Sequence, residues 1–371
     1  MRSTIALLAL GAASVSAAVV PAKGDIQQMK RNIIARQNKN LIKRNSVTTG
    51  ADDATILQFA LILEHLEDTF YSEALEKFDN ATFTEAGYPG VYAVLQQVAK
   101  DEHAHVEFLT AGLKAAGVEN PPQACTYNFP YTDVQSFLGL SQVVEGLGVS
   151  AYLGAAGDID NADYVTAAGS ILTVEARHNA FIRLLNNYDI ATPFDTPLSA
   201  SAVVGAASAL FKECPEGSAP SIQAPPALTL NTTSYELGSQ ITVAPANASA
   251  VNTNQQLYCG FASGLASAFS EWSNNQCTIP SQNLTGAAQT YLLLTTGPSL
   301  DDKSVVAGPV VLELGTPNIT VLSSNTSRST SGSAGASAGS NASATNAAGS
   351  IKTGGLAVAG GLFAGALSLL F

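Results

Sequence analysis

The sequence predicts an all-α four-helix bundle with a long middle crossover, followed by a small all-β domain of sandwich type. Three observations lead to this fold class. Residues 52–213 contain four helical segments of about 25 residues. About 16 residues separate the second segment from the third, a longer connection than the other two. From residue 221 to residue 322 the pattern changes to short alternating apolar runs.

The helices are delimited by residues typical of helix ends. Asp52 or Asp53 can cap the first helix, a Pro-Gly pair precedes the second, and Asp133 can cap the third. A shorter helical segment is expected over 199–211. The four long helices are expected over about 52–78, 91–116, 133–156 and 162–187.

The lengths of the connections predict the topology. Short loops join the first helix to the second and the third to the fourth, so each pair is expected to be antiparallel. The connection between the second and third helices contains Pro121-Pro122 and reaches ~50 Å when extended. It can therefore travel the whole length of the bundle, which predicts a crossover rather than a simple up-down-up-down order.

The C-terminal runs are punctuated by Gly, Pro and Asn and predict about 100 residues of β-structure. This region contains no histidine and few charged residues, so we do not expect catalysis there. The strands are expected at 228–230, 240–243, 291–295 and 310–314.

Charge and cysteine usage exclude several classes. The chain has 17 Lys and Arg against 29 Asp and Glu, a net charge of −12. This balance argues against a nucleic-acid partner, which would need a basic patch. The four cysteines have no Cys-x-x-Cys spacing, so neither a zinc site nor a thioredoxin-like redox pair is expected.

The N-terminal residues have the layout of a secretory segment. Residues 1–17 contain an early arginine, an apolar run and small residues at the end, which is typical of a signal peptide. Residues 18–44 are basic and contain the dibasic pairs Lys30-Arg31 and Lys43-Arg44. They are either a propeptide cut after a dibasic pair or a disordered arm.

The C-terminal residues predict attachment to the cell surface. Residues 323–350 are almost entirely Ser, Thr, Gly, Ala and Asn and indicate a glycosylated stalk. Residues 351–371 end in an apolar tail typical of a GPI-attachment signal, with the lipid placed near Asn346 or at Ser343. A transmembrane span is the alternative, but the tail is shorter than the ~20 residues a span needs. We therefore expect a secreted protein held at the membrane by a lipid anchor or in the cell wall.

Glycans and disulfides fit this route. Sequence proximity suggests Cys259–Cys277 and, by elimination, Cys125–Cys214, in an oxidising compartment. Seven Asn-x-Ser/Thr sites are expected to carry N-glycans: Asn80, Asn231, Asn247, Asn283, Asn318, Asn325 and Asn341.

All four histidines of the chain lie in the helical region, and two of them complete a Glu-x-x-His motif. Residues three apart share one face of a helix, so each motif directs a carboxylate and an imidazole the same way. The motifs are Glu102 with His105 on the second helix and Glu175 with His178 on the fourth.

The other two long helices each supply a glutamate and, seven residues later, a tyrosine. The pairs are Glu64 with Tyr71 and Glu145 with Tyr152. Glu145 lies in an otherwise uncharged stretch, and a buried lone carboxylate is costly unless it is paired or binds a metal. The alternative is a glutamate on the solvent face. Because each motif occurs twice in the same order, the helices form an internal repeat of two hairpins.

Four carboxylates and two imidazoles that converge in a bundle core predict a metal site. Two divalent cations would balance the four glutamates, with both histidines unprotonated. Ligands rich in oxygen and without thiolate favour iron or manganese over copper or zinc. The predicted cofactors are therefore two iron or manganese ions.

At these residues the chain resembles the ferritin-like superfamily, and more closely the secreted fungal stress-response and late sexual-development proteins, which are related to plant desiccation-related proteins. The resemblance covers roughly residues 50–320. The stretches that carry it are Phe59–Tyr71, Asp101–His105, Glu175–His178 and Ser304–Leu312.

The resemblance implies a role for each residue. It makes Glu64 and Glu145 terminal ligands, Glu102 and Glu175 bridging ligands, and His105 and His178 ligands of one ion each. Asp101 matches a carboxylate that orients the histidine of the opposite helix. Val174 stands where the second such acid would be. Glu67 and Asp68 are alternatives for the ligand on the first helix, while His65 and His103 are expected to point elsewhere.

Two functions compete. In the first, the protein is a cell-surface metalloprotein whose site reacts with O2 or peroxide as the small oxidant substrate, with Tyr71 and Tyr152 near enough to tune the metals or pass an electron. In the second, the bundle is metal-free, and the protein is a non-catalytic, glycosylated scaffold of the wall or surface. Both are linked to stress or development. A complete set of ligands favours the first.

Overall fold

The computed structural model describes residues 52–190, 192–232, 234–284 and 289–314, all within one compact unit. The predicted signal peptide, basic arm, stalk and anchor lie outside these residues. So do the predicted attachment sites Asn318, Asn325, Asn341, Ser343 and Asn346. Among the helices that the structure describes, none combines the length and the apolar character needed to cross a lipid bilayer.

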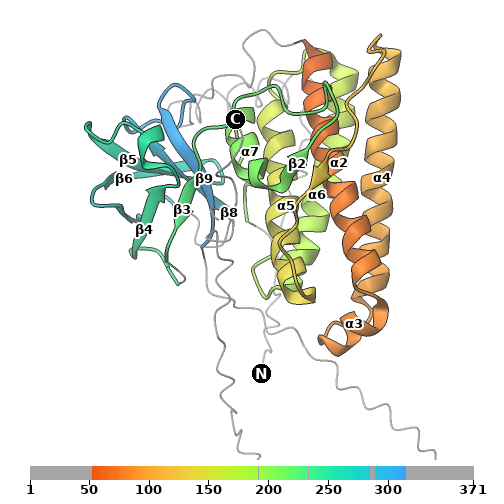
Figure 1. Cartoon of the computed structure of the whole chain (residues 1–371), viewed down its shortest axis with the longest axis horizontal. Coiled ribbons are helices and arrows are strands. Elements are labelled where there is room, and N and C mark those ends of the chain that lie inside the picture. The colour runs from red at the N-terminus through yellow and green to blue at the C-terminus, as the bar shows by residue number, and fades with distance from the viewer. Residues whose placement is uncertain (1–51, 191, 233, 285–288, 315–371) are drawn as a thin grey trace, which may run out of the picture. The chain divides into compact units, whose positions relative to one another are not determined.

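Four long helices form the bundle and lie side by side (Figure 1). Asp52 caps α2 by accepting from the Thr55 backbone N–H, and Asp133 caps α5 through a reciprocal pair of bonds with Ser136. Asn161 caps α6, and Gly90, with φ of 82°, precedes α4. The helices are α2 (Asp53–Lys77), α4 (Val91–Ala115), α5 (Val134–Ala155) and α6 (Ala162–Leu185).

The connection between α4 and α5 is the predicted long crossover, in an extended conformation. Its alternate rings Tyr127, Phe129 and Tyr131 stack in sequence, with centroids 5.5 Å and 6.1 Å apart. Phe129 and Tyr131 also meet Phe70 of α2 edge to face, so the crossover packs its aromatic side chains against the bundle.

The crossover is also tied to the segment that follows α7 (Ala200–Ala207). A short pair of antiparallel strands, β1 (Thr126–Tyr127) and β2 (Phe211–Glu213), joins them, and the Cys125–Cys214 disulfide lies beside this pair. The predicted helix over 199–211 is therefore too long. It ends at Ala207, is followed by the 3₁₀ turn η1 (Ser208–Leu210), and gives way to β2 because Phe211 pairs with Tyr127.

The β-rich part has two antiparallel sheets, which confirms the predicted fold class. The first has the order β3-β4-β7 and the second β6-β5-β8-β9. Apolar side chains of both sheets share one core, and the Cys259–Cys277 disulfide links β5 to β7 across it. The strands are β3 (Leu228–Leu230), β4 (Gln240–Pro245), β5 (Leu257–Ser263), β6 (Ala266–Trp272), β7 (Gln276–Thr278), β8 (Gln289–Thr295) and β9 (Val305–Glu313).

Several elements have no counterpart in the sequence prediction: α3 (Asn80–Glu85), β5, β6, β7 and the turn η2 (Ala248–Ala250). The physical reason why the sequence pattern does not reveal these elements is clearest for β5. It lies between β6 and β8, and it is covered on both faces. Phe261 packs into the core of the two sheets and Ala262 into the core of the bundle, so no polar residue alternates with them.

Strand β8 contacts the bundle directly. The Tyr291 hydroxyl donates to the Gly146 carbonyl of α5 at 3.0 Å and lies 2.8 Å from the Ser150 hydroxyl. A Cβ at Gly146 would lie 2.2 Å from Oε1 of Gln289, so a side chain there would displace this amide. Arg183 of α6 pairs with Glu313 of β9 at 2.9 Å, and both are buried. The hairpin of α5 and α6, the second of the bundle, is therefore bonded to the sheet through both of its helices.

Candidate metal centre

The two helical hairpins bring together all six predicted ligands. Glu64 comes from α2, Glu102 and His105 from α4, Glu145 from α5, and Glu175 and His178 from α6. The four glutamates are fully buried and the two histidines are less than a tenth exposed.

These residues form two overlapping groups of possible ligands. One contains Glu64, Glu102, His105 and Glu175; the other contains Glu102, Glu145, Glu175 and His178. Within each group the ligand atoms lie within 4.8 Å of one another. Glu102 and Glu175, one from each Glu-x-x-His motif, belong to both groups, so the cluster has two centres that share two carboxylates.

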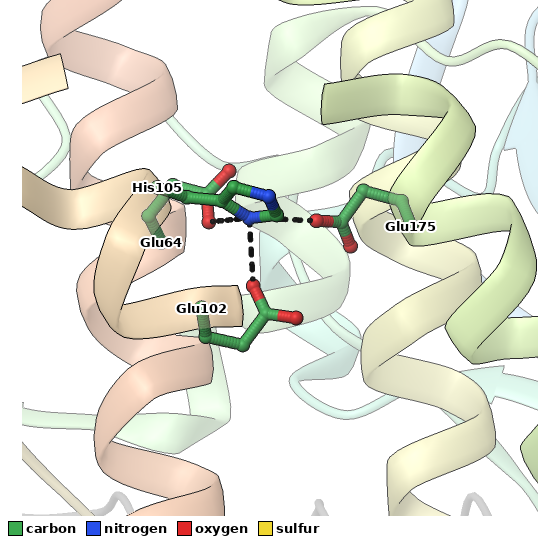
Figure 2. A group of neighbouring side chains, drawn as sticks. All are labelled: Glu64, Glu102, His105 and Glu175. Carbon is green, nitrogen blue, oxygen red and sulfur yellow. Dashed lines mark hydrogen bonds and ion pairs between the residues drawn. The ribbon is translucent and has the colours of Figure 1, made fainter. Parts of the chain in front are cut away.

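The first group surrounds the ring of His105 (Figure 2). Its Nδ1 lies 3.1 Å from Oε2 of Glu102, 3.2 Å from Oε2 of Glu64 and 3.4 Å from Oε1 of Glu175. One nitrogen carries at most one proton, so it cannot satisfy three carboxylates at once.

The second group surrounds His178 in a similar way. Its Nδ1 lies 2.7 Å from Oε1 of Glu102 and 3.5 Å from Oε2 of Glu145, both without hydrogen-bond geometry. Its other nitrogen, Nε2, lies 3.3 Å from Oδ2 of Asp101 on the opposite helix. Asp101 thus lies where the resemblance implied, beside a histidine whose Nδ1 faces the cluster.

The two tyrosines bond across the repeat. Tyr71 of the first hairpin donates to Oε1 of Glu145 in the second, and Tyr152 of the second donates to Oε1 of Glu64 in the first. All four side chains are buried. Each bond fixes one oxygen of a predicted terminal ligand and leaves the other oxygen for the cluster.

The pKa values of the cluster are shifted because several acids are buried close together. Burial, together with neighbouring glutamates, raises the pKa of Glu64 to about 7 and holds those of Glu67 and Glu175 well above the usual range. Burial alone would lower the pKa of His105, but bonds to Glu102, Glu175 and Glu64 outweigh it and raise the pKa to about 12. Without metal, protons must therefore neutralise part of this charge.

The unpartnered atoms fit a cation. Among the described residues, buried oxygens of Glu102, Glu145 and Glu175 and the Nδ1 of His178 have no hydrogen-bond partner. Buried polar atoms without partners are expensive, and here they converge on two shared centres. The residues present therefore suit two hard or borderline metal ions with oxygen and imidazole ligands.

Comparison with known families agrees with this geometry. Residues 52–187 match the family model of a ferritin-like domain. This region is a ferritin-like domain. It contains all six predicted ligands, and the β-rich part lies outside the match. The predicted resemblance to the ferritin-like superfamily is thus confirmed.

The chain is also similar to protein rds1 of Schizosaccharomyces pombe, with 29% identity over 134 residues. The match covers 36% of this chain and 32% of rds1, so the chain spans about a third of that relative's length. Similarity to a fungal protein agrees with the fungal branch indicated by the sequence motifs.

The ferritin-like domain holds one further buried acid, which the sequence offers only as an alternative to Glu64. Glu67, one turn further along α2, is buried beside the cluster. Its spacing of three residues from Glu64 places it on the same helix face, and this was the pattern in the sequence that could have identified it. The other substitute, Asp68, points away and lies 3.2 Å from Nδ1 of exposed His103.

The remaining histidine lies outside the cluster, as expected. Nε2 of His65 is 3.0 Å from the carbonyl of Pro122 in the crossover. His105 differs from His178 in its support. Val174 occupies the position equivalent to Asp101, and among the described residues no hydrogen bond involves Nε2 of His105.

Proposed function

We propose that the ferritin-like domain holds two iron or manganese ions and that the protein uses them in redox chemistry with O2 or peroxide at the cell surface. The observation that carries the proposal is the pair of overlapping ligand groups, which share Glu102 and Glu175. Two ions held by the two groups would satisfy the buried atoms that lack protein partners among the described residues. Four glutamates would balance two divalent ions.

The side chains would divide the work as follows. Glu64 and His105 would complete the ligands of one ion, and Glu145 and His178 would complete those of the other. Asp101 would accept a hydrogen bond from Nε2–H of His178 and so keep Nδ1 directed at the cluster. Bound iron or manganese supplies one-electron chemistry that the side chains themselves lack.

The tyrosines hold the terminal carboxylates in place. Each donates a hydrogen bond to one oxygen of Glu145 or Glu64, so that carboxylate keeps one rotamer and directs its second oxygen inward. Burial and the adjacent acids hold the pKa of both tyrosines well above 10, so their phenols stay protonated as donors.

A metal-free scaffold is the second candidate, and the asymmetry of the histidines favours it. His105 lacks the carboxylate that orients His178, and such support commonly contributes about 10- to 100-fold to metal affinity. The four described glycosylation sites, Asn80, Asn231, Asn247 and Asn283, are exposed, which suits a glycan-coated surface protein.

The location is also part of the proposal. Two disulfides are typical of secreted proteins. The predicted signal peptide, stalk and lipid anchor would place the ferritin-like domain outside the membrane or in the wall, and the link to stress or sexual development rests on the family resemblance.

Metal content tests the proposal. The purified full chain would be reconstituted anaerobically with Fe²⁺ or Mn²⁺, and the bound metal measured by mass spectrometry. We expect about two ions per chain in the wild type and none in Glu102→Gln/Glu175→Gln, because both shared carboxylates are lost. Glu73→Gln/Glu76→Gln, which neutralises two exposed acids of α2, is the matched control and should retain both ions.

A folded wild type that binds neither metal would exclude the metal site and leave the scaffold. Where metal binds, consumption of O2 or hydrogen peroxide by the loaded protein decides the redox part. Loaded protein that consumes neither would be a metal-containing scaffold.

A further inference from the structure

Glu67 is a fifth buried carboxylate beside the cluster, in addition to the four that the proposed pair of divalent ions would balance. The residue is only 3% exposed, and its Oε2 has no hydrogen-bond partner among the described residues. It lies one turn after Glu64 on the inner face of α2. An ionised carboxylate in such a place is costly unless a cation lies nearby.

The second hairpin makes room for this side chain. Gly148 follows Glu145 by three residues, as Glu67 follows Glu64, so the two positions are equivalent in the repeat. A Cβ at Gly148 would lie 2.7 Å from Oε1 of Glu67 and 2.7 Å from Oε2 of Glu175. Because Gly148 has no side chain, these two carboxylates can approach each other in the space beside it.

We propose that Glu67 is a further carboxylate of the metal cluster and matches it to one trivalent and one divalent ion rather than to two divalent ions. This inference rests on the metal site proposed above. Two divalent ions balance the charges of Glu64, Glu102, Glu145 and Glu175. The fifth carboxylate balances one additional positive charge, and through Glu175 it adjoins a residue shared by both centres.

Terbium and manganese test this without any turnover. Tb³⁺ carries the extra charge and Mn²⁺ does not, while both favour oxygen ligands. Tyr71 and Tyr152 bond to ligands of the two centres, so bound Tb³⁺ is detected by luminescence excited through tyrosine. Mn²⁺ binding is followed by calorimetry on the same preparations of full chain.

Glu67→Gln removes the charge and keeps the shape. We expect Tb³⁺ affinity to fall about tenfold or more, because one charge close to the ion is lost in a weakly screened site. Mn²⁺ affinity should change by less than about threefold, since the four balancing glutamates remain. Glu76→Gln, an exposed acid on the same helix, removes the same net charge and should change neither affinity.

Gly148→Ala tests the same space from the opposite hairpin. Its methyl group would displace the two carboxylates, so Tb³⁺ binding should weaken while the protein stays folded by circular dichroism. Gly169→Ala, in α6 with open space around it, is the control and should bind normally.

The outcomes separate this inference from the proposed function. Equal losses of both ions in Glu67→Gln, or no loss of either, would overturn the role of Glu67 while leaving the metal site intact. A wild type that binds neither ion would overturn the metal site itself, and the role of Glu67 with it.

Discussion

The two hairpins of the bundle, α2 with α4 and α5 with α6, present the same ligands at the same spacing but differ in the residues around them. Where the first has Glu67, the second has Gly148, and where the first has Asp101, the second has Val174. Asp101 supports His178 across the bundle, whereas no acid of the described residues takes the equivalent place beside His105. A duplicated set of ligands therefore produces two centres with unequal support and unequal charge.

The hairpins also differ in what covers them. Most of α5 is buried, and Tyr291 and Arg183 fasten the second hairpin to the sheet. In the first hairpin, α4 exposes one face that includes His103 and Phe108. The comparison indicates that the sheet holds the second hairpin in place. Four predictions test this and the other features that distinguish the hairpins.

The largest effect is expected at the contact between α6 and the sheet. Arg183→Ala would leave Glu313 as a buried charge without its cation and should destabilise the protein by about 3–5 kcal/mol. The melting temperature, measured calorimetrically, should fall by several degrees. Arg177→Ala, an exposed arginine of the same helix, should change it little. Equal effects of the two substitutions would show that the sheet does not hold this hairpin.

Removing the acid beside His178 and adding one beside His105 should reverse the difference in support between the two centres. Asp101→Asn should weaken metal binding about tenfold or more, because the asparagine can no longer fix His178 as its carboxylate does. Val174→Asp would provide the missing acid and should strengthen binding at the centre of His105. Both are measured by calorimetric titration with Mn²⁺. Asp68→Asn is the control, since Asp68 contacts exposed His103 instead. An unchanged Asp101→Asn would exclude the orienting role.

Because the pKa values of the clustered acids are raised, we expect the stability of the metal-free protein to fall as the pH rises. The pKa of Glu64 rises from its ordinary value of 4.5 to about 7, and those of Glu67 and Glu175 also rise. The folded state thus keeps protons that the unfolded state has lost, so the stability these groups contribute is present below about pH 4.5 and is lost as the pH rises toward 7.

Each such group changes the free energy of unfolding by up to about 1.4 kcal/mol per pH unit. We expect the metal-free protein to melt at a lower temperature at pH 7.5 than at pH 5, and Glu67→Gln to flatten this slope. Bound metal should reverse it, because metal binds the deprotonated ligands. A metal-free protein that becomes more stable between pH 5 and pH 7.5 would contradict this interpretation.

The smallest effect is expected at the loop of the first hairpin. Asn80 begins α3, is exposed and carries a predicted glycan there. Asn80→Gln should remove one glycan from the secreted protein, seen as a mass change, and leave metal content unchanged. A mass unaffected by the substitution would show that this site carries no glycan.

The helices of the bundle were predictable because their determinants are local. Asp52 and Asp133 cap helices through bonds to residues three positions on, and the Glu-x-x-His spacing places two ligands on one face whatever surrounds it. The extended crossover also followed from its length alone. Strand β5 was missed because a strand buried on both faces has no alternating pattern.

By itself the sequence determined the four long helices, the six candidate ligands and the repeat that contains them, since these depend on spacing along one chain. Only the tertiary structure decided that Tyr71 bonds to Glu145 and Tyr152 to Glu64, across the repeat. It alone placed Glu67 in the space left by Gly148. These contacts join residues of different helices, and their distances depend on how the helices pack, which no spacing within one helix specifies.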